Sequence, residues 1–228
     1  MQYLRTLTVF SLSLVIVFLA GSGVAKSCGW GGESDGDDEI IIMDIDADGT
    51  PLANDQSMVM TPKLQTETGN QLRKSKNYEQ AYIWYMKAAE KGYGEAQNNL
   101  AGLYEFGFGV PQDLAKAAHW YQLAAQSGEP HAQHSLGVMY AEGRGVIHNT
   151  DKARLWLAKS TDQKHLKAFA DLAAITDDGP EKLKWLLLAV HYGDDDAKPV
   201  LEAIRTESSK DQISKAEDLF KQWLAEKG

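Results

Sequence analysis

The sequence predicts an all-α fold, a superhelical solenoid of stacked helix hairpins, for most of its 228 residues. Three tryptophans, Trp84, Trp120 and Trp156, follow one another at a constant interval of 36 residues. Alanines, tyrosines and glycines around them recur at the same interval. A sustained period of this length is typical of a repeat array, in which each unit buries its apolar face against its neighbours, and not of one globular core.

The repeated unit has two halves. The first reads A-x-x-x-L-x-x-x-Y-x-x-G-x-G-V and occurs at 96–110 and 132–146; the second reads A-x-x-W-Y-x-x-A-A-x-x-G and occurs at 81–92 and 117–128. This pattern resembles the Sel1-like repeat, a relative of the tetratricopeptide repeat. The two closest copies are Glu95–Gly128 and His131–Lys164, and the resemblance extends over 61–228.

The units at either end depart from the pattern. A partial unit from Gly69 to Gly92 resembles an ordinary tetratricopeptide repeat with a short turn. In the unit after Trp156, the next tryptophan, Trp185, follows after only 29 residues, so we expect seven residues of the G-x-G-V loop to be missing. A half-unit then begins at Ala197. The last segment, 209–226, has an apolar and a charged face, as a terminal capping helix requires.

Spacing and end signals predict about ten helices from Pro62 onward. Ala96, Leu100 and Tyr104 are four residues apart and therefore share one face of a helix. The glycines of G-x-G-V end that helix, and Asp113 is placed to cap the next one. Asn149 or Asp151 is the corresponding cap one copy later. We expect the repeated tryptophans and tyrosines to lie in the core, because their period is that of the packing.

Residues 1–25 have the parts of a signal peptide. Arg5 precedes an apolar run from Val9 to Ala20, and Gly23 and Ala25 suit the −3 and −1 positions of a cleavage site. The sequence therefore predicts a periplasmic or secreted protein, with an uncleaved membrane anchor as the alternative. The net charge of −9 makes nucleic acid and anionic lipid poor candidates for partners.

Residues 26–60 read as an acidic, partly disordered region that contains a candidate β-hairpin, with a strand at Glu39–Met43 and a turn at Asp48-Gly49. The single cysteine, Cys28, is a weak candidate for lipidation, because Lys26 does not fit a lipoprotein signal. The same region contains four carboxylates at the spacing of a calcium loop. They are Asp44, Asp46, Asp48 and Asp55. Pro51 and the lack of a leading helix argue against calcium, so we expect no cofactor.

Neither catalysis nor metal binding has a clear signature. Motifs for a nucleophilic serine, a zinc protease and a phosphate loop are missing, and each G-x-G-V segment reads as a turn between helices. His131 and His134 are three residues apart on one helix face and could chelate a metal, but no carboxylate or cysteine completes a familiar motif. We therefore expect no metal site and no enzymatic activity.

The resemblance implies that the first helix of each hairpin lines a concave groove that binds a protein partner of unknown identity. Residues of these helices outside the packing pattern are the candidates for partner binding. They are Asn70, Arg73, Glu95, Asn98, Glu105, Phe106, His131, His134 and Glu142, with Gly102, Val138 and Ala141 on the same side. The resemblance also leaves two alternatives: a hydrolase or binding protein for cell-wall or β-lactam-type substrates, and a regulatory subunit of an envelope complex.

Overall fold

The computed structural model describes residues 17–20, 24–27 and 60–227, and the chain divides into two units, 1–61 and 62–228. In the first unit, β1 (Val17–Ala20) pairs with β2 (Val24–Ser27) in an antiparallel ladder that sets Val17 opposite Ser27. Both strands lie at or near the segment predicted to be a signal peptide. The predicted hairpin at 39–49, Cys28 and the calcium candidates Asp44, Asp46, Asp48 and Asp55 lie outside the described residues.

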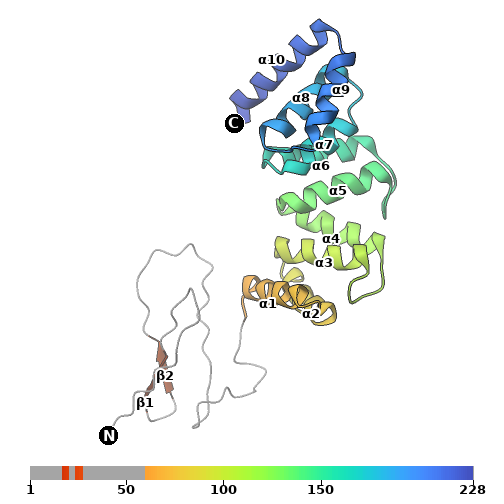
Figure 1. Ribbon diagram of the computed structural model, residues 1–228. Helices are drawn as coiled ribbons and strands as arrows, with labels where there is room; N and C mark the ends of the chain where they lie inside the picture. The colour runs from red at the N-terminus through yellow and green to blue at the C-terminus, as the bar shows by residue number, and fades with distance from the viewer. Residues whose placement is uncertain (1–16, 21–23, 28–59, 228) are drawn as a thin grey trace. The chain divides into compact units, whose positions relative to one another are not determined.

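The second unit is all-α, as predicted, and its described part has ten helices. They are α1 (Pro62–Lys74), α2 (Tyr78–Ala89), α3 (Gly94–Phe106), α4 (Leu114–Gln126), α5 (Pro130–Glu142), α6 (Thr150–Asp162), α7 (Leu166–Ala174), α8 (Gly179–His191), α9 (Ala197–Glu207) and α10 (Lys210–Lys227). Helices α1 to α8 form antiparallel hairpins that stack in chain order (Figure 1). The packing is most extensive within the first three hairpins.

The helix ends follow the predicted signals. The side chains of Asp113 and Asn149 accept hydrogen bonds of 2.9 and 2.8 Å from backbone N–H groups of the first turns of α4 and α6. Gly107 and Gly143 end α3 and α5 in the left-handed conformation, with φ of 69° and 71°. Of the two residues proposed as the cap of α6, Asn149 therefore takes that role.

The second glycine of G-x-G-V has an additional role. A Cβ on Gly145 would lie 2.1 Å from the carbonyl oxygen of Leu114 at the start of α4, and a Cβ on Gly109 would lie 2.5 Å from the backbone of Tyr78 at the start of α2. Each loop therefore touches the backbone of the preceding hairpin. This glycine is needed both for its positive φ and for the close contact between repeats.

The core confirms the prediction for the tyrosines and corrects it for the tryptophans. Tyr85 and Tyr121 are buried, whereas Trp84, Trp120 and Trp156 are only half-buried. The ammonium groups of Lys87 and Lys159 lie over the rings of Trp84 and Trp156, at 4.8 and 4.5 Å from the ring centroids. A repeating position on a helix fixes only the direction of a side chain. The long indole reaches the surface, where a lysine stem covers part of it.

The shortened unit also differs from its prediction. Helix α7 has 9 residues where α3 and α5 have 13. The turn that follows α7 spans only 175–178, where the corresponding earlier loops span 107–113 and 143–149. The seven missing residues are thus taken from both the helix and the loop, and not from the loop alone.

The last helix closes the stack. Helix α10 packs mainly across α8, and its buried residues are Ala216 and Trp223. The ring of Trp223 contacts Phe169 of α7 and Tyr192 at the end of α8. The predicted capping helix is therefore present, and Trp223, which sequence reasoning did not place inward, is its main anchor.

Candidate functional site: the first-helix face

The first helices of the hairpins are α1, α3, α5 and α7, and the side of the stack that they occupy is here called the first-helix face. Helix α1 contacts α3 and α5 contacts α7, while the described second helices α2, α4 and α6 contact one another less. The residues predicted to bind a partner lie on α1, α3 and α5.

Asn70 links the first two repeats. Its side-chain oxygen accepts hydrogen bonds from the Tyr85 hydroxyl at 2.8 Å and from the Asn99 amide at 3.0 Å. Its own amide group donates to the Glu95 carboxylate at 3.0 Å. Asn70 and Glu95 are thus brought together across α1 and α3. Both are also used within the fold, and Asn99 is a member of this group that sequence reasoning missed.

Glu105 is not a free groove residue, and this corrects its assignment. Its carboxylate is buried and accepts hydrogen bonds from the Tyr121 hydroxyl at 2.8 Å and from the Arg144 guanidinium at 2.6 Å. Arg144 also donates to Glu142 at 3.2 Å. The group joins α3, α4 and the loop after α5. Burial and the adjacent carboxylate of Glu105 raise the pKa of Tyr121.

His131 and His134 are brought together with two residues that sequence reasoning did not group with them. The ring of His165 lies 4.6 Å from that of His131 and 4.9 Å from that of His134. A ring nitrogen of His134 lies 2.5 Å from the Asp171 carboxylate on α7. Among the described residues, no group of three or more histidine, cysteine or acidic side chains has the geometry to hold a metal ion.

Phe106 begins an aromatic edge at the loop end of the first-helix face. It is 60% exposed, and its ring lies 5.7 Å from that of Phe108, which in turn stacks on Tyr78 at 4.8 Å. The next repeat has Glu142 and Arg144 at the positions of Phe106 and Phe108. The aromatic edge is therefore specific to one repeat and does not follow from the repeat pattern.

Asn98, Gly102 and Phe106 form a stripe along α3 that is not used by the fold. The Asn98 side chain is half-buried and has no hydrogen bond to another described residue. A Cβ on Gly102 would meet only the Tyr121 hydroxyl, at 3.7 Å, so the surface above it is open. Arg73 and His131 are exposed on the neighbouring first helices. Residues four apart share a helix face, so these three positions form one line.

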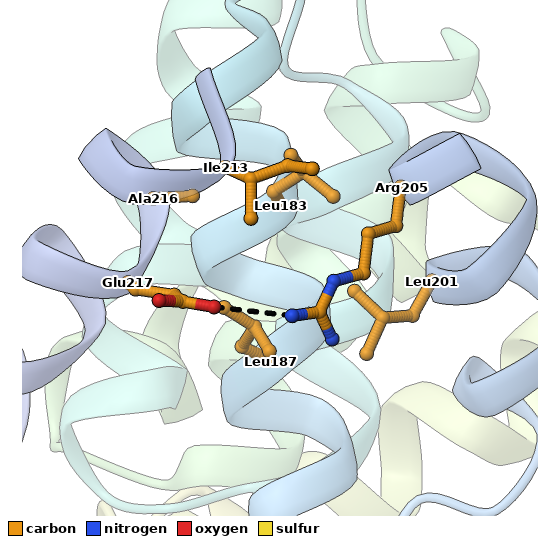
Figure 2. A pocket seen from close by; sticks show the side chains of 7 residues that line it. All are labelled: Leu183, Leu187, Leu201, Arg205, Ile213, Ala216 and Glu217. Carbon is orange, nitrogen blue, oxygen red and sulfur yellow. Dashed lines mark hydrogen bonds and ion pairs between the residues drawn. The ribbon is translucent and has the colours of Figure 1, made fainter. Parts of the chain in front are cut away.

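A hollow between α8, α9 and α10 offers no comparable site. It is lined mostly by aliphatic side chains, including Leu183 and Leu201, and the Arg205–Glu217 ion pair spans it at 3.1 Å (Figure 2). It has room for about one water molecule.

None of the described helices is both long and apolar enough to span a membrane.

Comparisons with known proteins agree with this architecture. The Sel1 repeat model matches residues 67–93, 94–129 and 130–165. A Sel1 repeat protein from Oxalobacter formigenes superposes with a TM-score of 0.58 and 29% identity, over 61% of this chain and 62% of that one. The protective antigen c5321 of uropathogenic Escherichia coli, which has an SLR fold, gives 0.62 and 26%, over 69% of this chain and 38% of that one.

This chain thus spans less than two thirds of either structure's length. Among curated proteins, none matches it significantly. Three consecutive Sel1 repeats over residues 67–165, together with the helical solenoid shared with the Sel1 and SLR structures, support a Sel1-like repeat protein.

Proposed function

We propose that this protein is an exported interaction scaffold that holds a segment of a protein partner against the first-helix face. Sel1 and tetratricopeptide-like repeats are typical of protein–protein interaction modules and generally serve as non-catalytic scaffolds. The observation that carries the proposal is the Asn98–Gly102–Phe106 stripe. There an amide without a hydrogen-bond partner among the described residues, and an exposed ring, flank a position without a side chain.

The chemistry of the stripe suits an extended or helical peptide. Asn98 can both donate and accept a hydrogen bond, so it can bind a peptide backbone group. Phe106 supplies apolar contact area, and aromatic residues beside polar groups are the usual composition of a contact patch. Gly102 leaves space for one side chain of the partner. The Asn70–Glu95 pair ties α1 to α3, which supports a rigid surface beside the stripe.

Export is part of the proposal and is supported by the residues at the N-terminus: a basic residue, an apolar run and small residues at the cleavage positions. Mass spectrometry of the protein purified from its native host tests it. We expect a mature chain that begins near Lys26. An intact Met1 would support the anchored alternative, and a diacylglyceryl mass on Cys28 would support lipidation.

Partner capture tests the binding surface. The double variant Asn98→Ala/Phe106→Ala should recover less partner from the envelope fraction than the wild type does. Gln122→Ala, an exposed position on α4, is the matched control and should recover the same amount. Both variants should have wild-type circular dichroism, because neither changes a buried packing residue. Equal recovery by the two variants would remove the stripe from the site.

A further inference from the structure

The stack of helices has a weak joint between α6 and α7. The buried apolar residues of α1 to α6 form one cluster and those of α7 to α10 form another. Only a small cluster, Leu157, Ala168 and Leu172, lies between them. Helices α6 and α7 also pack less extensively than α2 with α3 or α4 with α5. The described helices therefore form two blocks that share little core.

Three histidines lie at this joint. His131 and His134 come from α5, and His165 is the residue that precedes α7. The ring of His165 contacts both of the other rings, at centroid distances of 4.6 Å from His131 and 4.9 Å from His134. A ring nitrogen of His134 also lies 2.5 Å from the carboxylate of Asp171 on α7. The imidazoles thus bridge the two blocks on the first-helix face.

The charges around the cluster are unbalanced. Asp171 is the one carboxylate that contacts it among the described residues, and it can compensate one proton, on His134. Lys167, on α7, adds a positive charge that acts on His165. Lys164, which precedes His165 in the sequence, has its ammonium group over the Tyr192 ring, 6.0 Å from the ring centroid. A proton on the half-buried His165 would meet positive charge without a partner, which is unfavourable.

We propose that this cluster makes the joint a proton-sensitive hinge: acidification charges the imidazoles and releases the block α7–α10 from the block α1–α6. The hinge does not depend on the binding of a partner. Because α5 and α7 both belong to the first-helix face, opening would also change the spacing of that face.

The direction of the effect follows from His165. Burial, and then the charges of His134, His131 and Lys167, lower the pKa of His165 to about 4, whereas a free histidine titrates near 6.5. The open form therefore binds a proton more readily than the closed form. The closed form should lose stability as the pH falls from about 6.5 to about 4. Because His165 is only half-buried, solvent screening should limit the change to about tenfold in the open population.

Distances between spin labels test the hinge in the full-length chain. Cys28 is replaced by serine, and one label pair, on Gln122→Cys and Glu202→Cys, spans the joint between α4 and α9. A second pair, on Gln80→Cys and Gln122→Cys, lies within the first block. All three labelled positions are exposed. Between pH 7.5 and pH 5, the spanning pair should shift or broaden, while the inner pair stays constant.

Two variants assign the effect to the cluster. His165→Gln keeps a side chain of similar size but cannot take up the proton, so the change at pH 5 should disappear. His148→Gln, at an exposed histidine of the loop after α5, should retain it. If His165→Gln lacks the wild-type circular dichroism at pH 7.5, His134→Gln replaces it. An unchanged spanning distance at pH 5, an equal change in both pairs, or an unaltered response in the histidine variants would overturn the proposal.

Discussion

The hydroxyl of Tyr121 donates a hydrogen bond of 2.8 Å to the carboxylate of Glu105, which lies 16 residues earlier on the other helix of the same hairpin. Arg144 of the following loop donates to the same carboxylate at 2.6 Å. One buried acid therefore links both helices of its hairpin to the loop of the next repeat. Because both donors would lose their acceptor together, this acid is a sensitive point of the solenoid.

Replacing Glu105 should therefore destabilise the protein without any loss of apolar packing. Glu105→Ala leaves the Tyr121 hydroxyl and the Arg144 guanidinium without their acceptor, and such a change costs about 2–3 kcal/mol. The free energy of unfolding in urea measures it. Glu142→Gln is the control, because its exposed carboxylate forms a surface ion pair with Arg144, and it should stay within about 0.5 kcal/mol of the wild type. Equal losses in the two variants would contradict the role given to Glu105.

The neighbours Trp120 and Tyr121 give a direct test of the corrected core. Tyr121 is 5% exposed, so Tyr121→Ala removes a buried ring and should cost about 3–5 kcal/mol. Trp120 is half-buried, so Trp120→Ala should cost about 1–2 kcal/mol although the indole is larger. Thermal or urea unfolding of both variants decides the order. A greater loss for Trp120→Ala would restore the tryptophans to the core.

The repeat period made the fold predictable, because every unit must present the same packing positions to its neighbours. It identified the hairpins, the caps Asp113 and Asn149, and the capping helix. It could not separate the buried tyrosine from the half-buried tryptophan beside it, since both recur at the same interval. The hydrogen-bonded side chains that join neighbouring repeats could not be identified from the sequence, because their members lie far apart in it. Arg144 lies 39 residues from Glu105 and Asp171 lies 37 from His134, and neither partner recurs in the other units.

The glycines of the repeat should differ in their tolerance of alanine. Gly145 and Gly128 both have a positive φ, of 68° and 96°. A Cβ on Gly145 would lie 2.1 Å from a backbone oxygen, but a Cβ on Gly128 would have no neighbour within 4 Å. Gly128→Ala should therefore cost about 1–2 kcal/mol for the conformation alone. Gly145→Ala should cost clearly more, because the loop must move away from α4. Similar melting temperatures for the two variants would show that the loop contact is loose.

Gly102 offers the sharpest test of the proposed binding surface, because the space above it can be filled without removing any contact. Gly102→Leu places an aliphatic side chain between Asn98 and Phe106, where the partner segment is proposed to lie. The nearest atom to the new Cβ is the Tyr121 hydroxyl at 3.7 Å, an ordinary van der Waals distance, so the helix should still fold. Partner recovery should fall at least about tenfold, as expected when a contact worth more than about 1.4 kcal/mol is blocked. Gln122→Leu on α4 adds the same side chain to an exposed position away from the stripe, and it should leave recovery unchanged. If Gly102→Leu folds as the wild type does and recovers the partner equally well, the partner binds elsewhere on the chain.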